Sequence, residues 1–592
     1  MAKRTTTVVA AGLLVVLAVG ALGHGAPAPA APADELLQKL DAPLLFVKQF
    51  NYLGIHIYDV YYKWRPGGGI YIIENPSDPP ARHRIRPVID ATTPNSLGKG
   101  VYFDPDLSYD AKKLLFCYKN EAHGSTCIYE INIDGTGLRK VTDPSDTLCN
   151  YRGGHGGQHD VFPCYLPDGR ILFNSTRKSG LVPCANSGVD IMHTMEADGS
   201  NIRPLSVNNV NEFDPVLLND GRIMFGRWEY VDKTALTQQS LWTIFPDGTN
   251  ETALYANNMV FPEAVLDARP VPGTTNLIVG SFTKHNAPPR GTIGMIDIEA
   301  GKNDPAAIHN FEFPDQPTRD VGDSCEPWPL SRDVVLYSGK PAGAKFNALI
   351  IIDRSGRRSV VRSDPEIDLH SPMLVKPRAM PPLLPSHEAR RESTGRFLLQ
   401  NVYDGLPGVK PGEVKSLRVV EETSRVSATP GGAYNQTFLL SCALAFSAKH
   451  FLGVVPVEED GSAYFEAPSG KALYFQALDA DGRLVRSMRT FVQATPGVTR
   501  SCIGCHEYKY GAPPRRPQSA PLALSREPSK LKDESWGSGF MDFPSMVQPI
   551  LDKHCVSCHG GAKGFAGRLD LTGGWTEHFS ISYENLTARR HT

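Results

Sequence analysis

The sequence predicts a mainly β protein in three parts: a six-bladed β-propeller over residues 45–376, a β-rich unit over 396–511, and a small α-helical domain over 531–592. Three patterns support this prediction. A proline phrase recurs before hydrophobic strands, Asp-Gly pairs separate alternating apolar segments, and one stretch near the C-terminus has helical spacing. A chain of 592 residues is also too long for one core, and its 54 glycines and 48 prolines suit many short strands joined by turns.

The propeller prediction depends on six proline phrases spaced about 45 to 65 residues apart, close to one four-stranded blade each. The phrases are Phe103-Asp104-Pro105, Phe162-Pro163, Phe213-Asp214-Pro215, Phe261-Pro262, Cys325-Glu326-Pro327 and Ser371-Pro372. We expect each phrase to precede a polar turn and then a hydrophobic strand; such strands include 113–117, 170–174, 222–226, 276–280 and 334–338. Asp134-Gly135, Asp198-Gly199 and Asp247-Gly248 predict hairpin turns between strands. A β-sandwich with long loops is the alternative.

The rest of the chain divides at two connectors rich in proline and arginine, residues 377–395 and 511–530. The β-rich unit between them has its best strand patterns at 397–402, 416–420, 463–466, 473–477 and 489–493. After the second connector, residues 543–555 have helical spacing.

The N-terminus has the order of a secretory signal: Lys3 and Arg4, an apolar run over 8–22, and a small-residue stretch to Ala33. The run is short for a stable membrane span, although an uncleaved anchor is the alternative. We therefore expect export to the periplasm or an equivalent compartment, with residues 1–33 as the signal peptide. The net charge of −2 gives no reason to expect nucleic acid or an anionic membrane as a partner.

Two Cys-x-x-Cys-His pentapeptides carry the most specific chemistry in the chain, one at 502–506 and one at 555–559. In c-type haem attachment two thiols bond the macrocycle and the adjacent His can ligate the iron. A zinc ribbon is the competing interpretation, but it needs a second Cys pair close by, and here a proline-rich connector separates the motifs. Two covalent haem c groups are therefore predicted, in keeping with export, since bacteria attach this cofactor outside the cytoplasm.

The two motifs have different surroundings. No Met follows the second one, so we expect His559 as proximal ligand of an electron-transfer haem, with His578 or His591 as candidate distal ligands. The helical segment that ends in this motif resembles the start of a cytochrome c-like domain. Few residues follow His559, so we expect either a shortened domain or a haem that is partly uncovered. Tyr508 and Tyr510 follow the first motif; a tyrosine can ligate haem iron, but spacing alone favours simple packing on the macrocycle.

Seven of the 11 cysteines lie outside the haem motifs, which use four. An oxidising compartment permits disulfides, and Cys117 and Cys127 flank a short loop that one could close. Because seven is odd, at least one thiol lacks an intramolecular partner. Either a metal thiolate or a buried inert cysteine accounts for that thiol.

Four C-terminal stretches resemble the alpha subunit of hydrazine synthase and its planctomycete-type relatives. They are 455–466 (VPVEEDGSAYFE), 474–482 (YFQALDADG), 501–507 (SCIGCHE) and 547–555 (VQPILDKHC). The resemblance implies a six-bladed propeller and two c-type haems. At the catalytic haem of the family, a Tyr four residues after the motif His ligates the iron, and that His binds zinc. By this resemblance Tyr510 is the iron ligand and His506 a zinc ligand.

The family resemblance also implies that further zinc ligands come from the propeller, including a Cys and an acidic residue. We select Cys164 and His193 as candidates, with Asp59 as the acidic one. Cys149, His155, His159, Asp160 and Cys184 are the nearby alternatives. Zinc there would act as a Lewis acid or orient an amine.

The function expected from the resemblance is that of an oxidoreductase acting on small nitrogen compounds. In hydrazine synthase the haem–zinc pocket is linked to joining a nitric-oxide-derived intermediate with ammonia, while the second haem relays electrons. A redox partner protein and companion subunits in a heteromeric complex are implied in the same way. The alternative is a non-catalytic dihaem electron carrier or scaffold with a partner-binding propeller.

Overall fold

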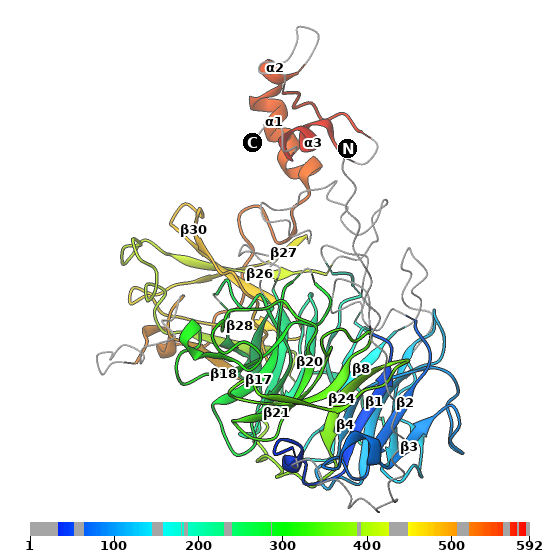
Figure 1. Cartoon of the computed structure of the whole chain (residues 1–592). Helices are drawn as coiled ribbons and strands as arrows, with labels where there is room; N and C mark the ends of the chain where they lie inside the picture. The colour runs from blue at the N-terminus through cyan, green and yellow to red at the C-terminus, as the bar shows by residue number, and fades with distance from the viewer. Residues whose placement is uncertain are drawn as a thin grey trace, which may run out of the picture.

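The computed structural model describes residues 34–51, 64–144, 158–178, 180–182, 188–229, 239–257, 259–285, 287–387, 392–424, 448–505, 520–560, 569–576 and 579–587. Over these residues the protein is mainly β, and its helices gather near the C-terminus (Figure 1). None of the described helices is long and apolar enough to cross a membrane.

The N-terminal part contains, within the described residues, six antiparallel groups of four strands. In chain order five of them are β4 to β7 (Val101–Leu107, Lys113–Lys119, Thr126–Asn132, Arg139–Lys140), β8 to β11 (Asp160–Tyr165, Ile171–Ser175, Ile191–Met195, Arg203–Pro204), β12 to β15 (Glu212–Leu217, Ile223–Trp228, Gln239–Ile244, Thr252–Tyr255), β16 to β19 (Ala264–Pro270, Leu277–Thr283, Thr292–Asp297, Ile308–Asn310) and β20 to β23 (Cys325–Pro329, Val334–Gly339, Ala348–Asp353, Arg358–Arg362). The third and fourth groups are joined by the single pair Gln239 and Ala264. Short 3-10 helices precede or connect strands at Leu37–Lys39, Pro80–Arg82 and Pro305–Ala307.

The sixth group joins the two ends of this part of the chain. Strand β24 (Asp368–Leu374) pairs with β1 (Leu44–Gln49), and β2 (Gly69–Ile73) and β3 (Ile85–Asp90) complete the sheet. Leu44 lies opposite Leu374 in this pairing. The innermost strands β4, β8, β12, β16, β20 and β24 all line one central cavity, so the six groups of strands lie around it. We call this part the six-sheet ring.

The innermost strands share a β-bulge at which one residue adopts positive φ. These residues are Asp104, Phe162, Asp214, Asp267, Glu326 and Ser371, with φ between 45° and 53°. As predicted, the proline phrases come before a turn and a hydrophobic strand. Five of the phrases lie at the bulges inside the innermost strands, since a bulge tolerates a residue that cannot donate to the ladder. Phe261-Pro262 precedes β16, whose bulge is at Asp267.

The outer strands follow the expected pattern more closely. The predicted segments 113–117, 170–174, 222–226, 276–280 and 334–338 correspond to β5, β9, β13, β17 and β21. The predicted Asp-Gly turns connect β6 to β7, β10 to β11 and β14 to β15, with Gly135, Gly199 and Gly248 at positive φ. These hairpin predictions are confirmed. Glycine is suited to these turn positions because it adopts positive φ without a steric cost.

The proposed Cys117–Cys127 disulfide is wrong. Cys117 lies opposite Ile128, and Tyr118 lies opposite Cys127, on the paired strands β5 and β6. Residues directly opposite one another share a face, and neighbours along a strand point to opposite faces. The two thiols therefore project from opposite sides of the sheet, and both are free.

The second β unit consists of two sheets that share one hydrophobic cluster. One sheet has the order β28-β25-β31 and the other β30-β29-β26-β27-β32. Their bounds are β25 Thr394–Leu399, β26 Ser416–Glu422, β27 Lys449–Pro456, β28 Ala463–Pro468, β29 Leu473–Leu478, β30 Leu484–Ser487, β31 Thr499–Cys502 and β32 Gly539–Phe540. Residues 489–493, a predicted strand, form only an isolated bridge at Val492.

The second β unit is fastened to the six-sheet ring by side chains that reach backbone carbonyls. The amide of Gln493 donates to the carbonyls of Leu205 and Gly248 at 3.1 and 2.7 Å. Arg500 donates to the carbonyl of Glu251 at 2.6 Å. In Figure 1 this unit lies between the ring and the C-terminal helices.

The C-terminal segment is helical, as its apolar spacing predicts. After a short 3-10 turn at Leu522–Ser525 and strand β32, a π-helical turn at Phe543–Val547 leads into α1 (Gln548–His554), α2 (Val556–His559) and α3 (Ile581–Thr587). Strand β32 pairs with β27, so the segment is tied to the second β unit before its helices begin.

Candidate functional site

The first Cys pair is held by backbone hydrogen bonds to the loop at 400–404. The amides of Gln400 and Asn401 donate to the carbonyls of Cys502 and Ile503 at 2.9 and 3.1 Å, and the amide of Cys505 donates to the carbonyl of Asp404 at 3.1 Å. The approach is close enough to require glycine between the thiols. A Cβ on Gly504 would lie 2.4 Å from the Asp404 carbonyl oxygen.

An apolar cavity of about 80 Å³ lies beside this pair. Cys502 and Cys505 line it together with the rings of Phe397, Phe465 and Phe475, among other side chains. Burial raises the pKa of the Cys505 thiol to about 12, so this thiol stays protonated near neutral pH. A Cys pair with one neutral thiol beside an aromatic wall suits attachment of a macrocycle better than a thiolate zinc site. His506 and Tyr510 lie outside the described residues.

The second Cys pair lies on the turn that joins α1 to α2. The amide of His559 donates to the carbonyl of Cys555 at 2.9 Å, so the motif is helical through its His. Its Nδ1 lies 3.2 Å from the carbonyl oxygen of Leu569. A carbonyl only accepts, so Nδ1 carries the hydrogen and Nε2 keeps its lone pair for a metal.

Large apolar side chains around the second motif are exposed. Ile550 on α1 is 58% exposed and Trp575 is 70% exposed, while Cys558 is itself exposed. A haem bound to Cys555 and Cys558 fits this donor set and would cover apolar surface. The candidate distal ligands His578 and His591 lie outside the described residues.

The structure does not bring Cys164 and His193 together. In the sheet β8 to β11, Cys164 lies opposite Leu172 and Leu172 opposite Thr194, so these three share a face. His193 is the neighbour of Thr194 and points to the other face, where its ring packs on Phe173. The pair therefore cannot share one metal, and this choice of ligands is corrected. Burial lowers the pKa of His193 to about 4.

The other candidates for the zinc site divide into two groups. Asp59, Cys149, His155 and Cys184 lie outside the described residues. His159 and Asp160 are described and fully buried, and the Asp160 carboxylate pairs with Arg177 at 2.6 Å.

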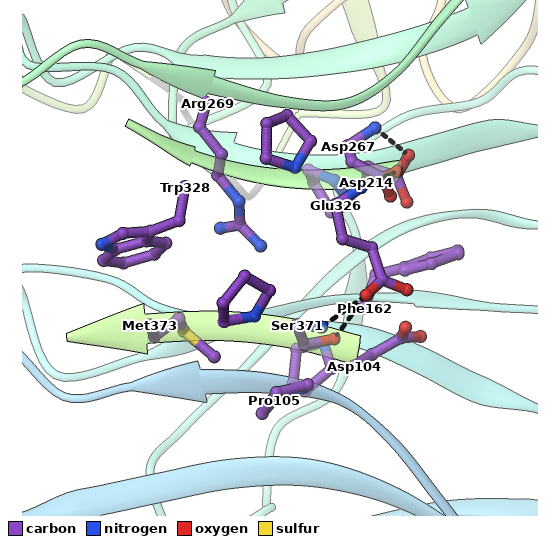
Figure 2. A pocket seen from close by; sticks show the side chains of 14 residues that line it. Asp104, Pro105, Phe162, Asp214, Asp267, Arg269, Glu326, Trp328, Ser371 and Met373 are labelled. Atoms are coloured by element: carbon purple, nitrogen blue, oxygen red, sulfur yellow. Dashed lines mark hydrogen bonds between the residues drawn. The ribbon is translucent and has the colours of Figure 1, made fainter. Parts of the chain in front are cut away.

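Sequence reasoning missed a group of acidic side chains in the central cavity of the ring. The cavity measures about 60 Å³, and Asp104, Asp214, Asp267 and Glu326 reach it from four different innermost strands (Figure 2). One guanidinium, Arg269, also lines the cavity. The proline phrases contained three of these residues, but a sequence pattern does not show which side chains of different strands meet on an axis.

Burial dominates the acid–base properties of this cluster. It raises the pKa of Asp104 and Asp267 well above the usual range, and neighbouring carboxylates add to the effect. Glu326 is the exception, because its contact with His370 and the hydrogen bonds from Ser371 outweigh burial and lower its pKa.

Comparison with known proteins identifies relatives of the whole arrangement. Residues 412–507 match a family model described as the hydrazine synthase alpha subunit middle domain. Hydrazine synthase subunit alpha from Kuenenia stuttgartiensis is 21% identical over 507 residues, a match that covers 69% of this chain and 60% of that protein. The chain thus spans less than two thirds of that relative's length.

One solved hydrazine synthase structure has a similar fold over most of the chain. The Kuenenia stuttgartiensis hydrazine synthase structure superimposes with a TM-score of 0.72 at 18% identity, covering 92% of this chain and 85% of that one. TolB from Acinetobacter baumannii has a TM-score of 0.38 at 10% identity over 56% of this chain and 66% of that one. In its middle domain and in its fold, this chain is therefore similar to the hydrazine synthase alpha subunit.

Proposed function

We propose that this chain is an exported dihaem c-type oxidoreductase acting on small nitrogen compounds, with nitric oxide and ammonia as the substrate class. One observation carries the proposal. The Cys502–Cys505 pair lines an aromatic cavity inside the segment that matches the hydrazine synthase alpha subunit middle domain. The alternative, a dihaem electron carrier or scaffold, is an outcome of the test below.

The architecture we propose assigns one blade of a six-bladed propeller to each sheet of the ring, over residues 45–376. Strand β24 beside β1 supports this assignment, because a propeller is closed by pairing its two chain ends within one blade. Residues 396–511 would form the haem-binding β domain, and 531–592 a cytochrome c-like domain. Residues 1–33 are the proposed signal peptide.

At the first site the thiols of Cys502 and Cys505 would hold the haem. Tyr510 would ligate its iron, and His506 would ligate a zinc ion. A haem bound there would supply an iron for redox chemistry on a small nitrogen ligand. The chain's own contribution is the aromatic cavity, which excludes water, and the backbone clamp at 400–404, which fixes the loop. Asp59 stays the candidate for a carboxylate zinc ligand.

At the second site Cys555 and Cys558 would hold a haem whose iron takes the Nε2 of His559. The hydrogen bond to Leu569 orients that imidazole. The exposed apolar surface around it suits electron exchange with a redox partner protein. Companion subunits in a heteromeric complex belong to the same proposal.

The test uses the full chain, exported through a haem-maturation system. We expect two haems per chain by pyridine haemochrome, one high-spin and one low-spin signal by electron paramagnetic resonance, and bound zinc. Tyr510→Phe should alter only the high-spin signal, and His506→Ala should remove one equivalent of zinc. Two low-spin haems, with spectra unchanged in Tyr510→Phe, would sink the tyrosine assignment and favour the electron carrier.

Activity is tested on the protein purified with its companion subunits. Hydrazine formed from nitric oxide and labelled ammonium is detected by mass spectrometry. We expect Tyr510→Phe to lose most of the product, whereas His554→Ala, an exposed His next to the second motif, keeps it. Absence of any labelled product from the wild-type complex would reject this substrate class.

A further inference from the structure

The bulges of the ring differ at one point. The residue before the positive-φ position is apolar in four innermost strands: Phe103, Val161, Phe213 and Leu266. In the neighbouring strands β20 and β24 the same position holds Cys325 and His370. The bulge residue of β20 is also a Glu where β4, β12 and β16 have Asp. A thiol, an imidazole and a longer carboxylate thus replace the usual residues at one junction.

Hydrogen bonds between neighbouring innermost strands explain why carboxylates occupy the bulges, but they do not explain the thiol and the imidazole. Asp214 accepts a hydrogen bond from the amide of Asp267 at 2.9 Å, and Asp267 accepts one from the amide of Glu326 at 3.0 Å. Glu326 continues the series by accepting from the amide of Ser371. The hydrogen bonds of Asp214 and Asp267 form without a thiol or an imidazole nearby in sequence, so such bonds do not explain Cys325 and His370.

The three side chains have the geometry of a shared ligand. Donor atoms of Cys325, Glu326 and His370 all lie within 4.8 Å of one another. The Nδ1 of His370 is 3.2 Å from both carboxylate oxygens of Glu326. Two atoms on one tetrahedral zinc, each bonded at about 2.0–2.1 Å, lie a little over 3 Å apart. Cys325 is 4% and His370 3% exposed, whereas the Glu326 side chain is 24% exposed, so the thiol and the imidazole are buried and the carboxylate borders the cavity.

One nitrogen of the His370 imidazole, Nε2, has no hydrogen-bond partner among the described residues. This nitrogen is buried. A buried ring nitrogen without a partner is unfavourable, because it has lost its hydrogen bond to water. An ion or a water bound at Nε2 would remove that penalty.

The surrounding charge favours a cation. Asp104, Asp214, Asp267 and Glu326 line the cavity, and Arg269 is the one guanidinium among its described lining residues. Buried carboxylates in such excess need either protons or a positive ion. A divalent ion would supply two charges beside Glu326.

We propose that Cys325, Glu326 and His370 bind a divalent transition metal, with zinc as the best match to a sulfur, oxygen and nitrogen donor set. Three protein ligands leave one position open, as in catalytic rather than structural zinc sites. The cavity of about 60 Å³ that Glu326 lines has room for a water in that position. The site shares no residue with either Cys-x-x-Cys-His motif, so it is an additional metal site of the ring.

The test measures zinc bound to the full-length haem-loaded chain in a His506→Ala background, so that zinc proposed near the first motif is not counted. Cys325→Val and His370→Phe each install a residue that another bulge already carries, which favours folding. After chelator treatment and titration with Zn²⁺, we expect one equivalent in the background protein. Each variant should bind it more than about 100-fold more weakly, since even outer-shell changes cost 10–100-fold.

Cys117→Ala is the matched control, because Cys117 is a buried thiol of the ring outside the cluster and should keep the zinc. Folded variants that retain one equivalent with unchanged affinity would overturn the proposal. Zinc-edge X-ray absorption on the background protein gives a second readout that needs no ligand variant. One sulfur scatterer at about 2.3 Å supports the site, and a first shell of only oxygen and nitrogen rejects it.

Discussion

The Nδ1 nitrogen of His559 lies 3.2 Å from the carbonyl oxygen of Leu569, ten residues further along the chain. The contact joins the end of α2 to the segment before α3, and the amide of Leu571 returns a hydrogen bond to the carbonyl of His559 at 2.8 Å. The imidazole is therefore fixed in one orientation and one tautomer before any metal binds.

His559→Ala should remove the axial ligand of the second haem while leaving its two thioether bonds intact. We expect two haems per chain by pyridine haemochrome, but loss of the low-spin signal in electron paramagnetic resonance. His554→Ala, five residues earlier on the same helical segment, is the control and should keep that signal. A low-spin haem that persists in His559→Ala would show that another residue ligates this iron.

Gly504→Ala should disturb the first haem site selectively. The new Cβ would lie 2.4 Å from the Asp404 carbonyl oxygen, so the loop must move away from its backbone clamp. Overpacking of this kind costs about 1–3 kcal/mol. We expect less haem at Cys502 and Cys505 by peptide mass spectrometry, with normal haem at Cys555 and Cys558.

Gly226→Ala provides the comparison for that variant. Its added Cβ would be 3.4 Å from Phe213, an ordinary contact, so both haems should be retained. Equal haem loss in the two glycine variants would mean that the effect is not local to the first motif.

Glu251→Gln should destabilise the junction between the six-sheet ring and the second β unit. Arg227 and Glu251 form a buried pair at 2.6 Å, and Arg227 also reaches the carbonyl of Phe491 in the second unit. Removing one partner of a buried pair leaves an uncompensated charge and costs about 3–5 kcal/mol. The loss is measured as the free energy of unfolding in urea. Asp481→Asn, which breaks an exposed pair with Arg483, should change it little.

Glu212 should make the stability of the ring depend on pH. Burial raises the pKa of its carboxyl from 4.5 to about 7. The unfolded chain then loses the proton first, so the free energy of unfolding falls as pH rises from about 4.5 to about 7. Above pH 7 the buried Glu212 carboxylate destabilises the folded state by about 3 kcal/mol, and below pH 4.5 this destabilisation is absent.

Glu212→Gln should remove this pH dependence, because the amide keeps an acceptor for the Met192 amide and does not ionise. We expect the variant to unfold at higher urea than wild type at pH 8 and at similar urea at pH 4. Parallel pH profiles for the two proteins would show that Glu212 does not titrate in this range.

The local patterns of this chain were predictable, while the places where distant segments meet were not. Asp-Gly turns and outer strands depend on neighbouring residues, so Asp134-Gly135 and 113–117 were assigned correctly. The bulges were not predicted, because a proline phrase looks the same before a strand and inside one. The pairing of Cys164 with His193 failed for a related reason, since sequence separation does not reveal which face of a sheet a side chain occupies.

The sequence motifs identified both Cys pairs, because attachment chemistry demands a fixed local spacing. The cluster of Cys325 and His370 escaped notice because 45 residues separate its two parts, and only the convergence of β20 and β24 brings them together.

The pairing of β24 with β1 also sets an order of events during synthesis. Strand β1 leaves the ribosome first among the strands of the ring, yet its inner neighbour ends at Leu374. Until that residue has been made, one edge of β1 lacks its partner strand β24, and the ring cannot close. Its folding is therefore dominated by a contact of very long sequence separation, which is slow and leaves strand edges open to misassembly. In the export proposed above, the ring would therefore close only after the strands up to β24 had crossed the membrane.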